Sequence, residues 1–279
     1  MDKFLIFGAI LLTHDHSVYR HVPFKDDRGQ GKFVLGKNVF VGAGAIILRN
    51  IEIGDNSIVA AIANISFKID SGEFVVIMGE SGAGKSTLLS LMGAMNSPTS
   101  GRYIVDDIDV YTLSQERQAD FRREFLGFVF QSFHLVPYLT VLENVMLPLT
   151  TLKLGRKKKQ AMAQKALVGV GLEGKINRLP SQISGGEKER VAIARAIVND
   201  PPIVLADEPT GNLDSRTTRE VMELLQRLNR KGITIILVTH STQCAEYAQR
   251  IFFLRDGRLV AEDKSTKKTT INGLKAPMK

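Results

Sequence analysis

The chain of 279 residues has no tryptophan and a single cysteine, Cys244. One cysteine excludes an intrachain disulfide framework and suits a reducing compartment. The net charge is +8, but no stripe of basic residues is interleaved with aromatic ones, so nucleic-acid binding is not expected. We interpret the basic run Arg156-Lys157-Lys158-Lys159 as solvated surface. With 44% hydrophobic residues, the chain is long enough to bury a core in one or two domains.

Long apolar runs are also missing from the sequence. The longest early run, Phe4 to Leu12, has nine residues, whereas a spanning helix needs about 20. Asp2 offsets the charge of Lys3, and no small-x-small cleavage site follows the run. We therefore expect neither a membrane span nor a secretion signal.

A glycine-rich segment, Gly79–Ser86, fits the phosphate-loop pattern G-x-x-x-x-G-K-[ST]. The apolar run Phe74–Met78 before it predicts a buried strand, and the residues after it have helical spacing. This context argues against a coincidental glycine turn. Lys85 is expected to reach the β- and γ-phosphates of ATP, and the Ser86 hydroxyl to ligate Mg²⁺. The residues expected to hold ATP here are Gly79, Glu80, Ser81, Gly82, Ala83, Gly84, Lys85, Ser86 and Thr87.

Two acidic residues, Asp207 and Glu208, follow a second apolar run, Ile203–Ala206. The carboxyl ends of strands in open α/β sheets carry the ligands. Asp207 is expected to hold Mg²⁺, and Glu208 to act as general base on the attacking water. The alternative is a solvated acidic pair, which a position after a buried strand does not favour.

Two further residues follow apolar runs. His240 ends the run Ile233–Thr239 and is expected to touch the γ-phosphate, unless it is a structural histidine. Gln131 follows Phe125–Phe130 and is expected to contact Mg²⁺ or the attacking water, unless it is an ordinary surface glutamine.

With these motifs in place, residues 63–262 resemble the ATP-binding cassette (ABC) ATPases. The family elements occur in order, and they include Asn212-Leu213-Asp214 and the signature residues Ser184, Gly185, Gly186 and Glu187. The resemblance implies an α/β fold with a RecA-like core around a mixed sheet and a helical subdomain between about Phe133 and Arg190. It also implies that the signature and Asp214 meet nucleotide in a head-to-tail homodimer with two sandwiched ATP molecules. Glu187 stands where the family more often has glutamine, a departure typical of a subgroup.

The segment 205–214 looks like the ATPases of lipoprotein-release and macrolide-export systems. In those systems the ATPase is a cytoplasmic subunit, or the first domain of a longer chain, at the inner face of the plasma membrane. The resemblance therefore implies export of lipoprotein, lipid, peptide or drug, with a membrane permease supplied in trans. A non-transport ABC ATPase that regulates a membrane partner, such as a cell-division complex, is the alternative.

Residues 1–62 do not fit that family. Leu35, Val41, Ile47, Ile53 and Val59 recur every six residues, which is typical of a left-handed parallel β-helix. The segment resembles the C-terminal coils of hexapeptide-repeat O-acetyltransferases, with His14 where that family carries a catalytic histidine. Ordinary strand alternation, a remnant with residual acetyl transfer and a fusion product without function stay open as alternatives. The basic residues 263–279 are expected to form a disordered tail.

The junction predicts one functional consequence. ABC ATPases usually stack adenine on an aromatic residue about a dozen positions before a strand that here is Ile65-Ser66-Phe67. Counting back reaches Glu52, and no aromatic residue lies between Phe40 and Phe67. We therefore expect weak nucleotide affinity and poor discrimination of ATP from GTP.

Overall fold

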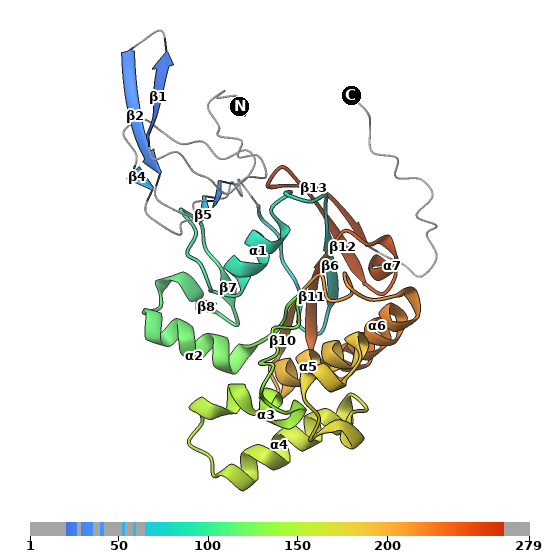
Figure 1. The fold of residues 1–279 in the computed structure, drawn as a ribbon. Coiled ribbons are helices and arrows are strands. Elements are labelled where there is room, and N and C mark those ends of the chain that lie inside the picture. The colour runs from blue at the N-terminus through green and yellow to red at the C-terminus, as the bar shows by residue number, and fades with distance from the viewer. Residues whose placement is uncertain are drawn as a thin grey trace. The chain divides into compact units, whose positions relative to one another are not determined.

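The computed structural model describes residues 65–264 and five short N-terminal strands (Figure 1). The chain separates into two compact parts. One part comprises Met1–Phe67, Gly79–Leu88 and Phe253–Ala261; the other comprises Lys68–Met78, Leu89–Phe252 and Glu262–Lys279. The N-terminal strands are β1 (His21–Asp26), β2 (Gly29–Leu35), β3 (Phe40–Val41), β4 (Glu52–Ile53) and β5 (Ile58–Val59).

From residue 65 onward, strands and helices alternate. The strands are β6 (Phe74–Met78), β7 (Ile104–Val105), β8 (Ile108–Asp109), β9 (Leu126–Val129), β10 (Ile203–Asp207), β11 (Thr234–Thr239), β12 (Arg250–Arg255) and β13 (Arg258–Lys264). The α-helices are α1 (Lys85–Met92), α2 (Gln115–Phe125), α3 (Val141–Met146), α4 (Arg156–Gly169), α5 (Gly185–Ile197), α6 (Ser215–Asn229) and α7 (Thr242–Ala245). Four 3₁₀ helices cover Val110–Thr112, Leu147–Thr151, Glu173–Lys175 and Pro180–Gln182.

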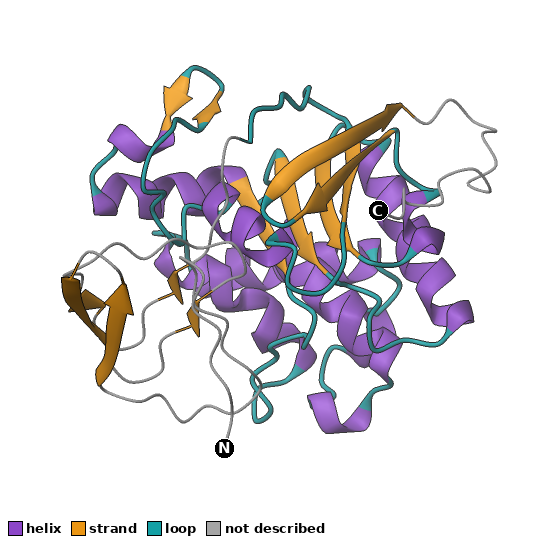
Figure 2. Ribbon diagram, turned by 90° about the horizontal axis from the view of Figure 1, so that it is seen from above, coloured by secondary structure: helices purple, strands orange, loops and turns teal. Residues whose placement is uncertain are grey.

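A six-stranded sheet in the order β13-β12-β6-β11-β10-β9 forms the centre of the fold, with helices around it in Figure 2. Its strands β6, β11, β10 and β9 are parallel. Parallel strands are covered on both faces, and so they appear as unbroken apolar runs. The residues of β11 are all buried, and four of the five in β6 are buried. The sheet predicted around the three motif-bearing strands is therefore present, with the carboxyl ends of β6, β10 and β11 at one edge.

The stretch from residue 130 to residue 202 contains helices and no strand. Helices α3 and α4 pack on each other and on α5, at the bottom of Figure 1. Thr140 begins α3 with a capping box, in which Glu143 is the reciprocal partner. Asn144 is fully buried and donates from Nδ2 to the carbonyls of Val136, Leu139 and Thr140. It therefore fixes the turn that enters the helical stretch.

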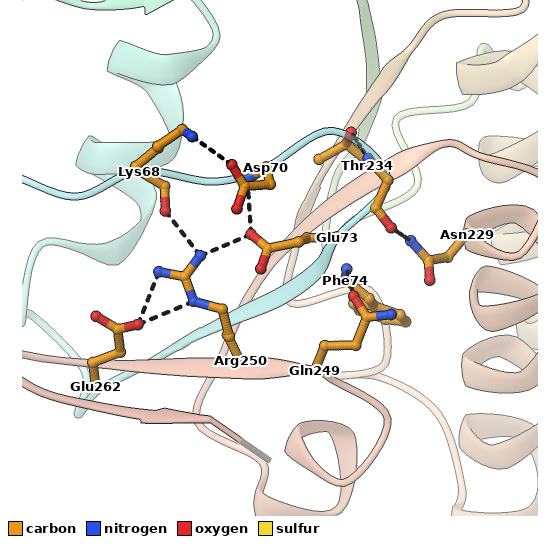
Figure 3. A network of polar contacts seen from close by, with 10 residues as sticks. Lys68, Asp70, Glu73, Phe74, Asn229, Thr234, Gln249, Arg250 and Glu262 are labelled. Atoms are coloured by element: carbon orange, nitrogen blue, oxygen red, sulfur yellow. Dashed lines mark hydrogen bonds and ion pairs between the residues drawn. The ribbon is translucent and has the colours of Figure 1, made fainter. Parts of the chain in front are cut away.

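Polar contacts hold the start of β6 to β12, as Figure 3 shows. The Arg250 guanidinium donates to Glu73 at 2.8 Å, to Glu262 at 2.8 Å and to the Lys68 carbonyl at 2.9 Å. The side chains of Arg250 and Glu73 are only 14% and 19% exposed, so this ion pair is partly shielded from solvent. Gln249 adds an acceptor for the Phe74 N–H. This network fixes the start of β6, the strand that leads into the phosphate loop.

One expected strand is not found. The structure gives residues 65–70 no strand, although the sequence predicted one at Ile65-Ser66-Phe67. The exposure of residues 65–70 alternates, as it does in a strand with one covered face. The prediction was wrong because an alternating side-chain pattern does not supply the backbone ladder that defines a strand.

The five N-terminal strands form small sheets. β1 pairs antiparallel with β2, β2 pairs parallel with β4, and β3 pairs parallel with β5. The segments that join β2 to β5, the position of His14 and residues 265–279 lie outside the described residues. The β-helix and the disordered tail therefore stay predictions. Within the described part of the chain, no helix is both long and apolar enough to cross a membrane.

Candidate functional site

The phosphate loop follows β6 directly and leads into α1 at Lys85. The Lys85 ammonium donates to the Gly79 carbonyl at 2.7 Å and to the Glu80 carbonyl at 2.9 Å, so it lies over the loop. Gly82 and Gly84 have φ values of +81° and +97°, which glycine adopts without strain. The loop is thus a turn of backbone around a buried lysine, as phosphate binding requires.

The backbone of the β12–β13 hairpin packs against the phosphate loop. A Cβ on Gly79 would collide with the backbone carbonyl of Leu254, so only glycine fits there. The Gly257 N–H donates to the Ala83 carbonyl at 3.0 Å. Asp256 and Gly257 both have positive φ, as in a type I′ hairpin turn. The sequence analysis gave this hairpin no role, because its contacts with the loop join segments far apart in the chain.

Glu208 lies just beyond β10 in a left-handed conformation, with φ 45°. Its carboxylate is 12% exposed and contacts His240, with 2.8 Å between Oε1 and Nδ1. The other oxygen, Oε2, accepts a hydrogen bond of 3.0 Å from the Thr239 hydroxyl. Thr239 is fully buried and also accepts from the Ser241 N–H. Glu208 and His240, predicted from separate strands, are therefore brought together, and Thr239 is a third member that the sequence analysis missed.

Gln131 lies beside the turn that follows Glu208. Its backbone carbonyl accepts from Asn212 Nδ2 at 3.2 Å, and its Nε2 would be 3.2 Å from a Cβ on Gly211. The Gly211 N–H donates to the Glu208 carbonyl at 3.0 Å. The Gln131 side chain thus lies against the turn that Glu208 begins, and the absence of a side chain at Gly211 makes room for the glutamine.

The signature residues form the start of α5. Ser184 is the N-cap: its Oγ accepts from the Glu187 N–H, and Glu187 Oε2 accepts from the Ser184 N–H at 2.8 Å. The hydrogen bond from the Ser184 backbone holds the pKa of Glu187 below its usual range. Ser184 and Gly185 are exposed, so this helix N-terminus is open to an anionic partner. Either glutamate or glutamine completes a capping box, which explains why Glu187 is tolerated.

Asp214 is the N-cap residue of α6. Its carboxylate accepts from the backbone of Arg216 and Thr217, both at 3.0 Å, and from the Thr217 hydroxyl at 2.7 Å. A Cβ on Gly186 would collide with the Thr217 methyl, so α5 and α6 approach closely there. Asp214 therefore supports the signature through Thr217, and its nucleotide contact stays a prediction.

The residues predicted for Mg²⁺ are oxygen or amide donors, which suit this cation. Asp207 is the last residue of β10, Ser86 lies in the first turn of α1, and Gln131 lies two residues after β9. Within the described residues, no group of three or more His, Cys, Asp or Glu could hold a metal ion alone. Mg²⁺ typically keeps several waters and binds one or two carboxylates plus substrate phosphates, so the donors present fit it.

Comparison with known proteins identifies the family. The family described as ABC transporter matches residues 62–211. The ABC transporter ATP-binding protein YvrO of Bacillus subtilis is 45% identical over 206 residues, which is 74% of this chain and 90% of the relative. The macrolide export ATP-binding/permease protein MacB of Rhodopirellula baltica is 43% identical over 227 residues, which is 80% of this chain but 33% of MacB.

Two solved structures of one protein are similar as well. The dimeric structure of MJ0796, a bacterial ABC transporter cassette, matches with 44% identity and a TM-score of 0.67, over 72% of this chain and 89% of that one. A post-hydrolysis state of the MJ0796 cassette, bound to ADP and Pi, matches equally well. The fold and the site define a phosphate-loop ATPase. The chain belongs to the ABC transporter family, as its ATP-binding domain.

Proposed function

We propose that this chain is the ATP-hydrolysing subunit of an exporter and that it powers a membrane permease supplied in trans. The observation that carries the proposal is the contact of Glu208, at the end of β10, with both His240 and Thr239, at the end of β11. The names of the relatives support export: one is a macrolide exporter, and another, from Pseudomonas syringae, a probable syringafactin exporter. The proposed location is the cytoplasmic face of the plasma membrane.

The chemistry follows from the hydrogen bonds of the Glu208 carboxylate. The buried Thr239 hydroxyl donates a hydrogen bond to Oε2 and so orients the carboxylate. In the proposed mechanism Glu208 accepts a proton from the attacking water, and His240 donates toward the γ-phosphate. Lys85 and Ser86 hold the phosphates, and Asp207, Ser86 and Gln131 hold Mg²⁺. The metal, when bound, neutralises charge that develops on the phosphate oxygens.

The proposal includes a head-to-tail homodimer. The signature lies at a helix N-terminus that is exposed to solvent and that can bind an anion. In the proposed dimer, the phosphate of ATP bound to the second subunit occupies this position. The dimeric structures of the MJ0796 cassette support the dimer. Glu187 retains the capping box that keeps this helix end in place.

The test is the variant Glu208→Gln, which keeps the side-chain size but removes the base. With ATP and Mg²⁺ it should accumulate as a stable dimer in light scattering, since the bound ATP is not hydrolysed. Glu223→Gln, an exposed change on α6, is the matched control and should stay as monomeric as the parent. If Glu208→Gln remains monomeric with ATP, the dimer mechanism is wrong. Copurification with a permease that lacks substrate release would favour a regulatory role instead of export.

For residues 1–62 we propose a fragment of a hexapeptide-repeat acetyltransferase. Its support is the register of the two parallel pairs: Val34 pairs with Glu52 and Phe40 with Ile58, so each pair spans three hexads (34 to 52 and 40 to 58). Three hexads are one coil of a left-handed β-helix. Turnover of acetyl-CoA by the whole chain, abolished by His14→Ala, would show that acetyl transfer survives. We expect no turnover, because solenoids need several stacked coils.

We also propose that the cassette lacks its adenine-stacking residue. Loss of a stacking contact of ~1–3 kcal/mol would raise the nucleotide Kd about 5- to 150-fold. Titration of ATP and GTP into the protein should therefore give weak and similar affinities. Micromolar ATP binding with a strong preference over GTP would contradict the proposal.

A further inference from the structure

A guanidinium bridges the signature helix to the turn that follows Gln131. Arg195, in the last turn of α5, donates from Nη1 to the His134 carbonyl at 2.6 Å and from Nη2 to the Phe133 carbonyl at 2.7 Å. These bonds span about sixty residues of sequence. Both nitrogens therefore fix two consecutive peptide groups, which a single donor could not orient.

The peptide groups that Arg195 binds are strained. Phe133 and His134 have φ values of 58° and 46°, although neither is glycine. Two successive left-handed residues cost about 1–3 kcal/mol each and persist only where the surroundings impose them. The His134 N–H donates to the Ser132 carbonyl at 2.6 Å, which tightens the turn. The Arg195 guanidinium holds this turn from α5, because its fork matches the two carbonyls.

The same turn of α5 also holds the strand before Gln131. A Cβ on Gly127 in β9 would collide with the backbone carbonyl of Ala196, so α5 and β9 are in close backbone contact. Gln131 therefore lies between two anchor points, Gly127 before it and Phe133-His134 after it. The two α5 residues that contact these anchor points, Arg195 and Ala196, are adjacent in sequence.

We propose that Arg195 is a positioning residue for Gln131. It holds the backbone after Gln131 so that the glutamine side chain stays beside the Glu208–Gly211 turn. Because Ser184 caps the other end of α5, the signature and Gln131 are joined by one rigid helix of thirteen residues. Burial lowers the pKa of the Arg195 guanidinium, although the nearby Glu189 acts in the opposite direction. The inference rests on the role proposed above for Gln131.

The test is Arg195→Lys, which keeps the charge but loses the fork. Misplacing a catalytic group by about 1 Å can cost about 10²-fold in rate, so kcat for ATP should fall about 10- to 100-fold, with KM for ATP changed less than about threefold. Arg122→Lys is the matched control: Arg122 lies in the last turn of α2 and donates to the Ala94 carbonyl at 2.8 Å. It should leave kcat near the parent value.

A double-mutant cycle separates positioning from general damage. If Arg195 acts through Gln131, Arg195→Lys should cause no further loss of kcat in a Gln131→Ala background. Amide hydrogen exchange over residues 131–136 should also become faster in Arg195→Lys, and not in Arg122→Lys.

Three results would overturn the inference. These are an undiminished kcat in Arg195→Lys, an equal loss in Arg122→Lys, and an additive loss in the Gln131→Ala background. The role of Gln131 itself has a separate criterion. If Gln131→Ala alone leaves kcat unchanged, the proposed function of Gln131 is wrong; if it lowers kcat while Arg195→Lys does not, only the positioning role is wrong. Should Arg195→Lys fold poorly, Arg195→Gln, which retains one donor nitrogen in place of two, repeats the cycle.

Discussion

Replacing Glu189 by glutamine should remove a dependence of stability on pH. Glu189 lies on α5 with none of its surface exposed, and within residues 65–264 neither carboxylate oxygen has a hydrogen-bond partner. Burial raises the pKa of this carboxyl to about 9, although the nearby charge of Arg195 acts in the opposite direction. The native protein therefore holds this proton at neutral pH, whereas the unfolded chain releases it.

The sign and size of the effect follow from these two pKa values. Between the ordinary pKa of 4.5 and the native value of about 9, the native state binds more protons than the unfolded state. The free energy of unfolding therefore falls as pH rises through this window, by about 1.4 kcal/mol per pH unit. At pH ~7.5 the loss relative to pH ~4.5 is about 4 kcal/mol. Glutamine cannot ionise, so Glu189→Gln should not show the loss.

Urea unfolding at about pH 6, 7 and 8 measures this directly. The difference in unfolding free energy between Glu189→Gln and the parent should widen by about 1.4 kcal/mol per pH unit, because other titrations cancel. Glu223→Gln, exposed on α6, should give a difference that stays constant. A constant difference for Glu189→Gln as well would refute the reasoning and would mean that Glu189 is ionised in the native state, paired with Arg195.

Two further substitutions test single contacts of the site. Thr239→Val keeps the shape but removes the hydroxyl that donates to Glu208, so single-turnover hydrolysis should slow about tenfold, about 1.4 kcal/mol, with unchanged ATP affinity. Gly127→Ala places a methyl group against the Ala196 carbonyl, so it should lower the free energy of unfolding by about 1–3 kcal/mol in urea titrations. An unchanged hydrolysis rate in Thr239→Val would contradict the role of the Thr239 hydroxyl. An unchanged unfolding midpoint in Gly127→Ala would contradict the close approach of β9 to α5.

The parts of the site that the sequence predicted are held by contacts close in sequence. The Lys85 ammonium binds carbonyls five and six residues away, and the Ser184–Glu187 capping box spans three residues. Such contacts depend only on residue type and spacing, and they therefore produce a motif that can be recognised in the sequence. The buried strands β6, β10 and β11 were predictable for the same reason, as short apolar runs that end in a polar motif.

The contacts that the sequence did not predict join distant segments. Thr239 lies inside an apolar run, where threonine fits a strand for its β-branched shape alone. Its hydroxyl gains a role only because Glu208, 31 residues earlier, turns back toward it. Arg195 is likewise an ordinary basic residue of a helix until the fold brings the Phe133 carbonyl to it. Residue type and spacing do not reveal such pairs, because the partners are far apart in the chain. For Arg195 the acceptor is also a backbone carbonyl, which any residue type provides.

Helix α5 has different supports at its two ends, and this difference decides what each variant should disturb. At its start, the signature is held by its own capping box and by Thr217, which Asp214 fixes. At its end, Arg195 and Ala196 hold both sides of Gln131. A helix of thirteen residues is about 20 Å long and stiff over that length. We therefore expect loss of the Arg195 contact to release only the Phe133-His134 side of Gln131, while the close contact of Ala196 with Gly127 and the capping box at Ser184 stay in place.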